Sequence, residues 1–196
     1  LGGKVKYLRH AASGWISSMV EPFINDIKEI NNFYFDENCT IYKNYINQME
    51  IFKKQGQGKF GISHFICLDG VNFMFELRGA TQTYYDLIDY PDEAKKIIDF
   101  STKLCIKVQD DFFKTIGLLQ GGTVSNVSQW LPGKIVSESV DAFHLTSSQM
   151  FEEWGLDVVK TLFNHFNGGV IHLHTNGHHL INSISKIRGL KCIVFL

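Results

Sequence analysis

The sequence predicts an α/β fold in which parallel strands alternate with crossover helices. Short apolar segments that end in a loop recur along the chain, and segments with helical spacing follow them. The last residues, Cys192 to Leu196, form an apolar run typical of a buried parallel strand. With 196 residues, 44% of them hydrophobic and 20% charged, the chain can bury a core of its own. We therefore expect one α/β domain over residues 1–196, either a barrel or a doubly wound sheet.

Three segments predict the main helices. The first carries apolar residues at helical spacing, namely Tyr42, Tyr45, Ile46, Met49 and Phe52. The second begins at Pro91, which suits the first helical turn, and Asp92 and Glu93 follow it at the positive end of the helix dipole. The third begins after Thr146 or Ser147 as N-cap and can close at Gly168. A stripe at intervals of four predicts its buried face: Met150, Trp154, Val158, Leu162 and Phe166.

Four segments predict strands that run into loops. They are Phe60–Gly70, Gly117–Asn126, Gly133–Phe143 and Val170–His174. A further helix is expected over His178–Ile187, directly after the last of these strands.

Composition restricts the partners. Nineteen basic and twenty acidic residues leave a net charge of −1, and no cluster of Lys and Arg could neutralise a row of phosphates, which argues against nucleic acid. No apolar run approaches the roughly 18 residues that cross a bilayer, and the N-terminus lacks the layout of a secretory signal. Four widely spaced cysteines indicate reduced thiols. We therefore expect a soluble, cytoplasmic protein without membrane contact that acts on a small-molecule substrate.

The stretch GGVIHLHTNGHHLI, Gly168 to Ile181, places four histidines within eight residues. His172 and His174 lie two apart on the predicted strand, so their side chains share one face. Imidazole is a good zinc ligand, and catalytic zinc takes three protein ligands and leaves one position open. Metal binding, substrate binding or acid–base chemistry, and a structural role all remain open for this pair. His178 and His179 follow an Asn-Gly turn and are expected to face solvent or cap the loop.

Two aspartates lie at predicted strand ends. Asp69 and Asp141 could act as catalytic carboxylates, with His174 as a third catalytic group, or they could cap the turns that follow. Trp130 is expected to wall the mouth of the site, and a glycine pair could admit a ligand close to the backbone. The candidate substrate-binding residues are Gly70, Gly121, Gly122, Trp130, His144 and Asn176.

Three stretches together resemble the uroporphyrinogen decarboxylase superfamily, which includes zinc methyltransferases that serve corrinoid proteins. They are Glu76–Phe100, Ser139–Phe166 and Gly168–Leu190. The resemblance implies a TIM (β/α)₈ barrel with its site at the carboxyl ends of the strands, a fold of roughly 250 residues. Because the chain is shorter, we expect an incomplete barrel that lacks its N-terminal and C-terminal portions, and whose open strand edges could pair two copies into a homo-oligomer.

The resemblance favours one branch of the superfamily. Methyltransferases of this kind carry His-x-Cys-Gly, in which His and Cys bind zinc. Here the residues read His172, Leu173, His174 and Thr175, so the first ligand matches and histidine replaces the second. The resemblance implies a third ligand beyond Leu196.

The leading hypothesis is therefore a methyltransferase-like enzyme in which zinc activates a thiol and a corrinoid protein is the partner. Nothing in the chain matches the arginine-rich N-terminal segment of the decarboxylases. Metal-free decarboxylation of a tetrapyrrole or other polycarboxylate is the alternative enzyme hypothesis, in which aspartate would stabilise positive charge. An inactive fragment or binding module is the third.

Overall fold

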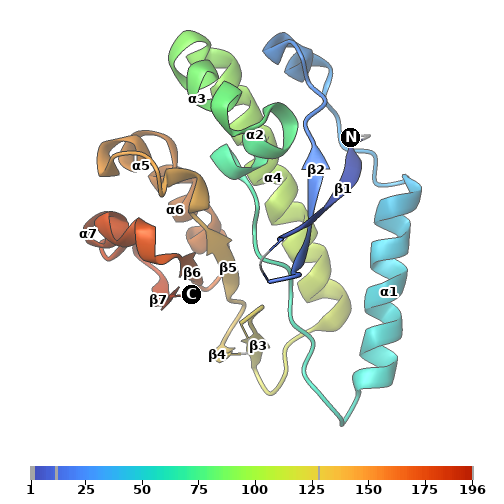
Figure 1. Cartoon of the computed structure of the whole chain (residues 1–196). Helices are drawn as coiled ribbons and strands as arrows, with labels where there is room; N and C mark the ends of the chain where they lie inside the picture. Colours follow the sequence, from blue (N-terminus) through green and yellow to red (C-terminus); the bar gives the residue numbers. More distant parts are fainter. Residues whose placement is uncertain (1–2, 12, 128, 196) are drawn as a thin grey trace.

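The computed structural model describes residues 3–11, 13–127 and 129–195 and shows an α/β chain with three small sheets (Figure 1). The strands are β1 Lys4–Arg9, β2 Ile16–Glu21, β3 Gly122–Val124, β4 Trp130–Pro132, β5 Val136–Ser139, β6 Gly169–Leu173 and β7 Leu190–Phe195. The α-helices are α1 Thr40–Gly56, α2 Gly70–Arg78, α3 Ala80–Asp89, α4 Pro91–Ile116, α5 Ser148–Trp154, α6 Leu156–His165 and α7 Ile181–Ile184. Short 3₁₀ helices are η1 Ile27–Asn32, η2 Asp141–Phe143 and η3 Thr175–Leu180.

The prediction of an incomplete (β/α)₈ barrel is wrong for the described residues, whose strands form three separate small sheets. Their strands form two antiparallel pairs, β1–β2 and β3–β4, and one parallel sheet in the order β5-β6-β7. The segment Gly117–Asn126 contributes β3, which pairs with β4 in an antiparallel hairpin instead of continuing a parallel sheet. The segment Phe60–Gly70 makes only single bridges, from Ser63 to Val124 and from Cys67 to Glu138. Strands and helices do alternate along the chain, as predicted, but the strands of the described residues do not form a barrel.

The parallel sheet confirms the strand prediction for the end of the chain. Ser139 of β5 pairs with His172 of β6, which in turn pairs with Val194 of β7. The run expected over Cys192–Leu196 is β7, whose described residues end at Phe195; Leu196 lies outside the described residues. Because the strands are parallel, the carboxyl ends of β5 and β6 lie side by side. These two ends carry the histidines and the aspartate described below.

The helix predictions are confirmed with changes at their boundaries. The helix expected from Pro91 is α4, with Pro91 in its first turn and both acidic residues in place. The helix expected between Thr146 and Gly168 is divided at Gly155 into α5 and α6. A Cβ at Gly155 would lie 2.6 Å from the Phe143 ring, so this close approach requires glycine. The helix expected from His178 is a 3₁₀ turn followed by one turn of α-helix.

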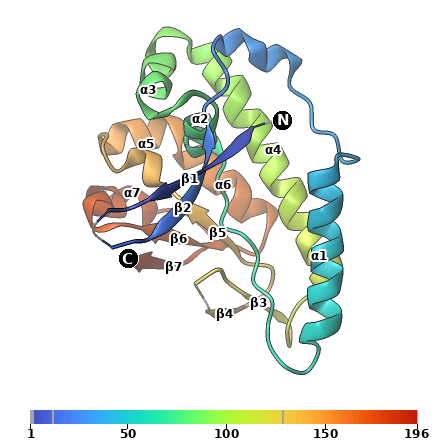
Figure 2. The same cartoon turned by 45° about the vertical axis from the view of Figure 1, so that its right-hand side comes forward.

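Helix α4 forms the centre of the helical layer. It packs against α1, α2 and α6, and Figure 1 shows α1 running beside it at the outer edge. The β1–β2 hairpin, which the sequence did not predict, contacts α2, and the Val20 amide donates to the Glu76 carboxylate at 2.7 Å. Figure 2 shows this hairpin in front of the parallel sheet. Among the described residues, no helix is both long and apolar enough to cross a membrane.

Candidate metal centre

Three candidate ligands converge at the carboxyl ends of β5 and β6. His172 lies in β6, His174 directly follows that strand, and Asp141 begins the 3₁₀ turn after β5. The Nε2 atoms of the two histidines are 3.0 Å apart, and Nε2 of His174 lies 3.7 Å from Oδ2 of Asp141. One ligand atom from each residue fits within 4.8 Å of the others. The face shared by residues two apart on a strand thus brings both imidazoles to one carboxylate.

The spacing of these atoms fits a tetrahedral zinc site. Ligands bound at the usual Zn–N distance of about 2.0–2.1 Å would lie about 3.3 Å from one another. Two of the three separations, 3.0 and 3.7 Å, bracket that value, and all three lie within 4.8 Å. Two imidazoles and one carboxylate leave one position of a tetrahedron for a substrate, which is typical of catalytic zinc.

Burial prepares the first histidine for this role. His172 is half-buried, and desolvation lowers the pKa of its imidazole, with the nearby His174 acting in the same direction and Asp141 opposing it. A lowered pKa favours the neutral ring, which is the form that binds a metal. Asp141 and His174 are exposed, so the site is open to solvent on the side of these two residues.

His144 lies behind Asp141. Its side chain is buried, and Nε2 has no hydrogen-bond partner among the described residues but lies 3.5 Å from Oδ1 of Asp141. Desolvation lowers the pKa of this imidazole, while Asp141 raises it. Gly177 leaves the room that His144 occupies, because a Cβ there would lie 2.6 Å from Cδ2 of His144 and 2.6 Å from Cδ1 of Leu173.

Asn72 of α2 fixes the turn that carries Asp141. Its Nδ2 donates to the carbonyl of Ser139 at 2.6 Å, and its Oδ1 accepts from the amide of Ala142 at 2.9 Å. The Ser139 hydroxyl also accepts from the Asp141 amide at 3.3 Å. Asn72 was not predicted as a site residue, because a polar residue in the first turn of a helix does not indicate a contact with the end of a distant strand.

Asp69, predicted as a catalytic carboxylate, lies inside the protein. It is 2% exposed and lies near Glu138 of β5, which is also 2% exposed, and neither of its carboxylate oxygens has a hydrogen-bond partner among the described residues. Burial raises the pKa of Asp69 to about 6, and burial followed by the charge of Asp69 raises the pKa of Glu138 well above its usual range. Gly70 follows in a left-handed conformation, with φ of 56°, and its amide donates to the buried Ser101 hydroxyl. All four residues of β5, Val136–Ser139, are buried, and an acidic residue inside a predicted strand was the signal that could have identified Glu138.

The other predicted substrate-binding residues lie in two places. Asn176 is exposed in η3, close in sequence to the histidine pair. Gly121, Gly122 and Trp130 belong to the β3–β4 hairpin, which lies at the amino-terminal side of the parallel sheet. The structure therefore brings Asp141, His144, His172 and His174 together and separates the hairpin residues from them.

Comparison with protein-family models, curated proteins and solved structures finds no match for this chain.

Proposed function

We propose that Asp141, His172 and His174 bind a zinc ion and that the chain is a metal-dependent transferase of the corrinoid-linked methyltransferase kind. The observation that supports this proposal is the convergence of three donor atoms within 4.8 Å at the ends of neighbouring strands. Zinc, when bound, lowers the pKa of a coordinated thiol and makes it a nucleophile at neutral pH. The sequence resemblance adds the methyl group and the corrinoid protein to the proposal.

The residues of the chain have separate tasks in this function. The neutral imidazoles of His172 and His174 present nitrogen lone pairs, and the Asp141 carboxylate partly neutralises a divalent cation. Nε2 of His144 lies 3.5 Å from Oδ1 of Asp141, so a small shift on metal binding would form a hydrogen bond that positions this carboxylate. The exposed side of the site leaves space for a thiol substrate to approach.

The alternative of metal-free decarboxylation has less support. It would use Asp69 to stabilise positive charge on a substrate, yet Asp69 is 2% exposed and lies near Glu138. A carboxyl pair without a cation nearby retains a proton, and a protonated acid stabilises no cationic ring. The observed burial therefore favours the metal-dependent function. The cytoplasmic setting expected from the cysteine spacing belongs to this proposal as well.

Methyl transfer from methylcobalamin to an alkyl thiol tests the function. The sulfur of the thiolate takes the methyl group, the cobalt–carbon bond breaks, and the cobalt keeps the electron pair of that bond. We expect zinc-supplemented protein to form the thioether, measured by mass spectrometry, and His172→Ala and His174→Ala to fall to the background rate. His179→Ala, an exposed histidine outside the ligand set, is the matched control and should retain the rate.

Two outcomes would contradict the proposal. The first is a rate that is equal in all four proteins, and the second is folded, zinc-loaded wild type that forms no thioether above the uncatalysed reaction. The second outcome with zinc still bound through the two histidines would favour the binding-module hypothesis.

A further inference from the structure

A cavity lies at the opposite end of the parallel sheet from the candidate metal ligands. Its volume is about 540 Å³, within the range of small-molecule sites. Thr123 lines it, and the hydroxyl of Thr123 accepts from the amide of Ile135, the residue directly before β5. The candidate metal ligands, in contrast, follow the carboxyl ends of β5 and β6. Nothing in the metal-site chemistry accounts for this cavity.

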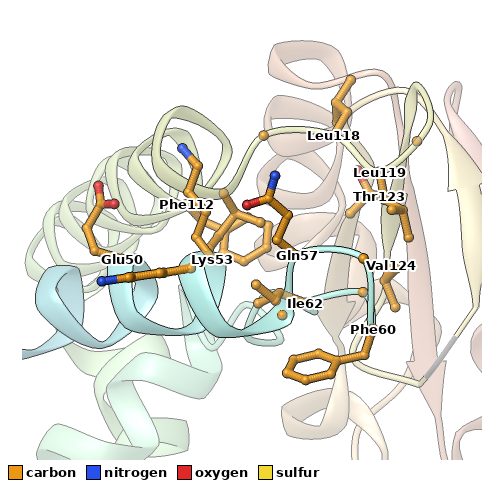
Figure 3. A pocket seen from close by; sticks show the side chains of 17 residues that line it. Glu50, Lys53, Gln57, Phe60, Ile62, Phe112, Leu118, Leu119, Thr123 and Val124 are labelled. Atoms are coloured by element: carbon orange, nitrogen blue, oxygen red, sulfur yellow. The ribbon is translucent and has the colours of Figure 1, made fainter.

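Two walls of different origin form the cavity. Figure 3 shows Glu50, Lys53 and Gln57 on the end of α1, facing Leu118 and Leu119 of the loop before β3. Between these walls lies an apolar floor. It includes Ile62, Phe112 and Val124.

Glycine keeps the floor open at one position. A Cβ at Gly61 would lie 2.6 Å from Cγ2 of Val124 and 3.1 Å from Cδ2 of Leu119, so any larger residue would force these two side chains to move. Both of them line the cavity. The backbone of this segment therefore passes closer to the floor than an ordinary residue allows.

The mouth of the cavity carries positive charge. Lys53 and Lys54 are exposed, and no salt bridge among the described residues involves either of them. Glu50 lies one turn earlier on the same helix, so the three side chains leave one net positive charge at the rim. Both lysines also suit the last turn of α1, where cations stabilise the helix dipole. Stabilisation of the helix dipole would affect the stability of the fold and would not require a ligand.

We propose that this cavity binds an organic anion with an apolar or aromatic body. The floor takes the apolar body, because burying it removes apolar surface from water on both partners. Lys53 and Lys54 pair with the anionic group at the mouth. This proposal is independent of the function assigned to the metal centre.

Two fluorescent probes of matched shape test the proposal. 8-Anilinonaphthalene-1-sulfonate is an aromatic anion, and N-phenyl-1-naphthylamine is the same ring system without the charge. Trp130 can transfer excitation energy to a bound probe, because it lies next to the cavity: its Nε1 donates a hydrogen bond to the carbonyl of Leu119 on the cavity wall at 2.8 Å. We expect the anionic probe to bind folded wild type saturably. Excitation of tryptophan should produce emission from the bound probe, and this emission should be weaker in Trp130→Phe.

Substitutions then test separately the positive charge at the mouth and the space inside the cavity. Lys53→Gln/Lys54→Gln should weaken the binding of the anionic probe about thirtyfold, since each of the two charges contributes on the order of 1 kcal/mol at contact distance in water, and should leave the binding of the uncharged probe unchanged. Lys43→Gln, an exposed lysine of α1 outside the cavity, is the matched control. Gln57→Trp fills the exposed mouth and should weaken both probes. Near-UV circular dichroism confirms that each variant is folded, since loosely packed states also bind such probes.

Three results would overturn the proposal. They are the absence of saturable binding to folded wild type, equal affinity for the anionic probe in the double lysine variant and the Lys43→Gln control, and binding of both probes that Gln57→Trp leaves unchanged. The second of these results, together with a lowered melting temperature of the double lysine variant, would assign the lysines to the helix dipole alone.

Discussion

Nε2 of His172 lies 3.0 Å from Nε2 of His174, a hydrogen-bond distance between two atoms that would both carry lone pairs in a metal site. Without a metal, one of these nitrogens must donate a proton to the other. A metal ion would replace that proton and bind both atoms, so the metal-free and metal-bound forms can share nearly the same arrangement. The strand therefore holds both imidazoles where one metal ion could contact them, because both side chains point to one face.

The contact between Asn72 and the Asp141 turn predicts a remote effect on metal affinity. Asn72→Ala removes the bonds to Ser139 and Ala142, which should lower the free energy of unfolding by about 1–3 kcal/mol and weaken zinc binding. Urea unfolding and zinc titration measure the two effects. Thr83→Ala is the control, since it removes a hydrogen bond to Gly79 within α3, away from the site. Equal zinc affinity in both variants would show that Asn72 does not position Asp141.

Gly177 predicts a steric route to His144. Gly177→Ala places a methyl group 2.6 Å from Cδ2 of His144, and overpacking of this kind costs about 1–3 kcal/mol of stability. Displacement of His144 should also weaken zinc binding. The double variant Gly177→Ala/His144→Ala relieves this clash, so thermal unfolding should show a coupling energy between the two sites. Strictly additive effects would contradict the close approach.

The Asp69–Glu138 pair predicts a pH dependence of stability with a definite sign. Burial raises the pKa of Asp69 from 3.8 to about 6, so the folded state holds a proton that the unfolded state releases between these values. This contribution to stability is fully present below the unfolded pKa and is lost as the pH rises through about 6.

Asp69→Asn should remove the loss of stability that wild type shows as the pH rises, because asparagine does not titrate. The stability of the variant relative to wild type should therefore rise between pH 4 and pH 7, by at most about 1.4 kcal/mol per pH unit for one proton. Denaturant unfolding across this range measures the difference, and comparison with wild type cancels the opposite contribution of buried histidines such as His64, whose pKa burial lowers. A difference that is flat with pH would show that the pair holds no extra proton.

Arg78 and Asp86 form a buried ion pair, with Nε of the arginine 2.7 Å from Oδ2 of the aspartate. The guanidinium also donates to the carbonyls of Ile24 and Asn25 and so ties the start of the helical layer to α2. Asp86→Ala leaves the arginine charge buried and should cost about 3–5 kcal/mol. Asp99→Ala breaks the exposed pair with Lys103 and should cost less than about 1 kcal/mol. Equal losses in urea unfolding would contradict the assignment of a buried, structural pair.

The sequence predicted the local elements better than their assembly. Pro91 with its two acids marked the start of α4, and the apolar run from Cys192 marked β7, because these signals are local. The pairing of β3 with β4 could not be predicted in this way, since the partner of a short strand depends on contacts made elsewhere in the chain. The same limit explains the wrong barrel prediction.

At the candidate site, too, the sequence predicted local features but not the contacts between distant segments. The alternation His172-Leu173-His174 predicted two side chains on one face, which the structure confirms. Asp141 was predicted as a catalytic carboxylate, and its position beside the histidines depends on the pairing of Ser139 with His172. The sequence places Asp69 and Asp141 alike at strand ends, and only tertiary packing distinguishes the buried acid from the exposed one.

The zinc content of purified, metal-supplemented protein after dialysis tests the central claim most directly. We predict about one zinc ion per folded wild-type chain, as a single site with three protein ligands requires. His172→Ala and His174→Ala should lose it, whereas a His178→Ala/His179→Ala control should retain it. Folded wild type without zinc, or zinc that persists unchanged in both single variants, would contradict the metal centre.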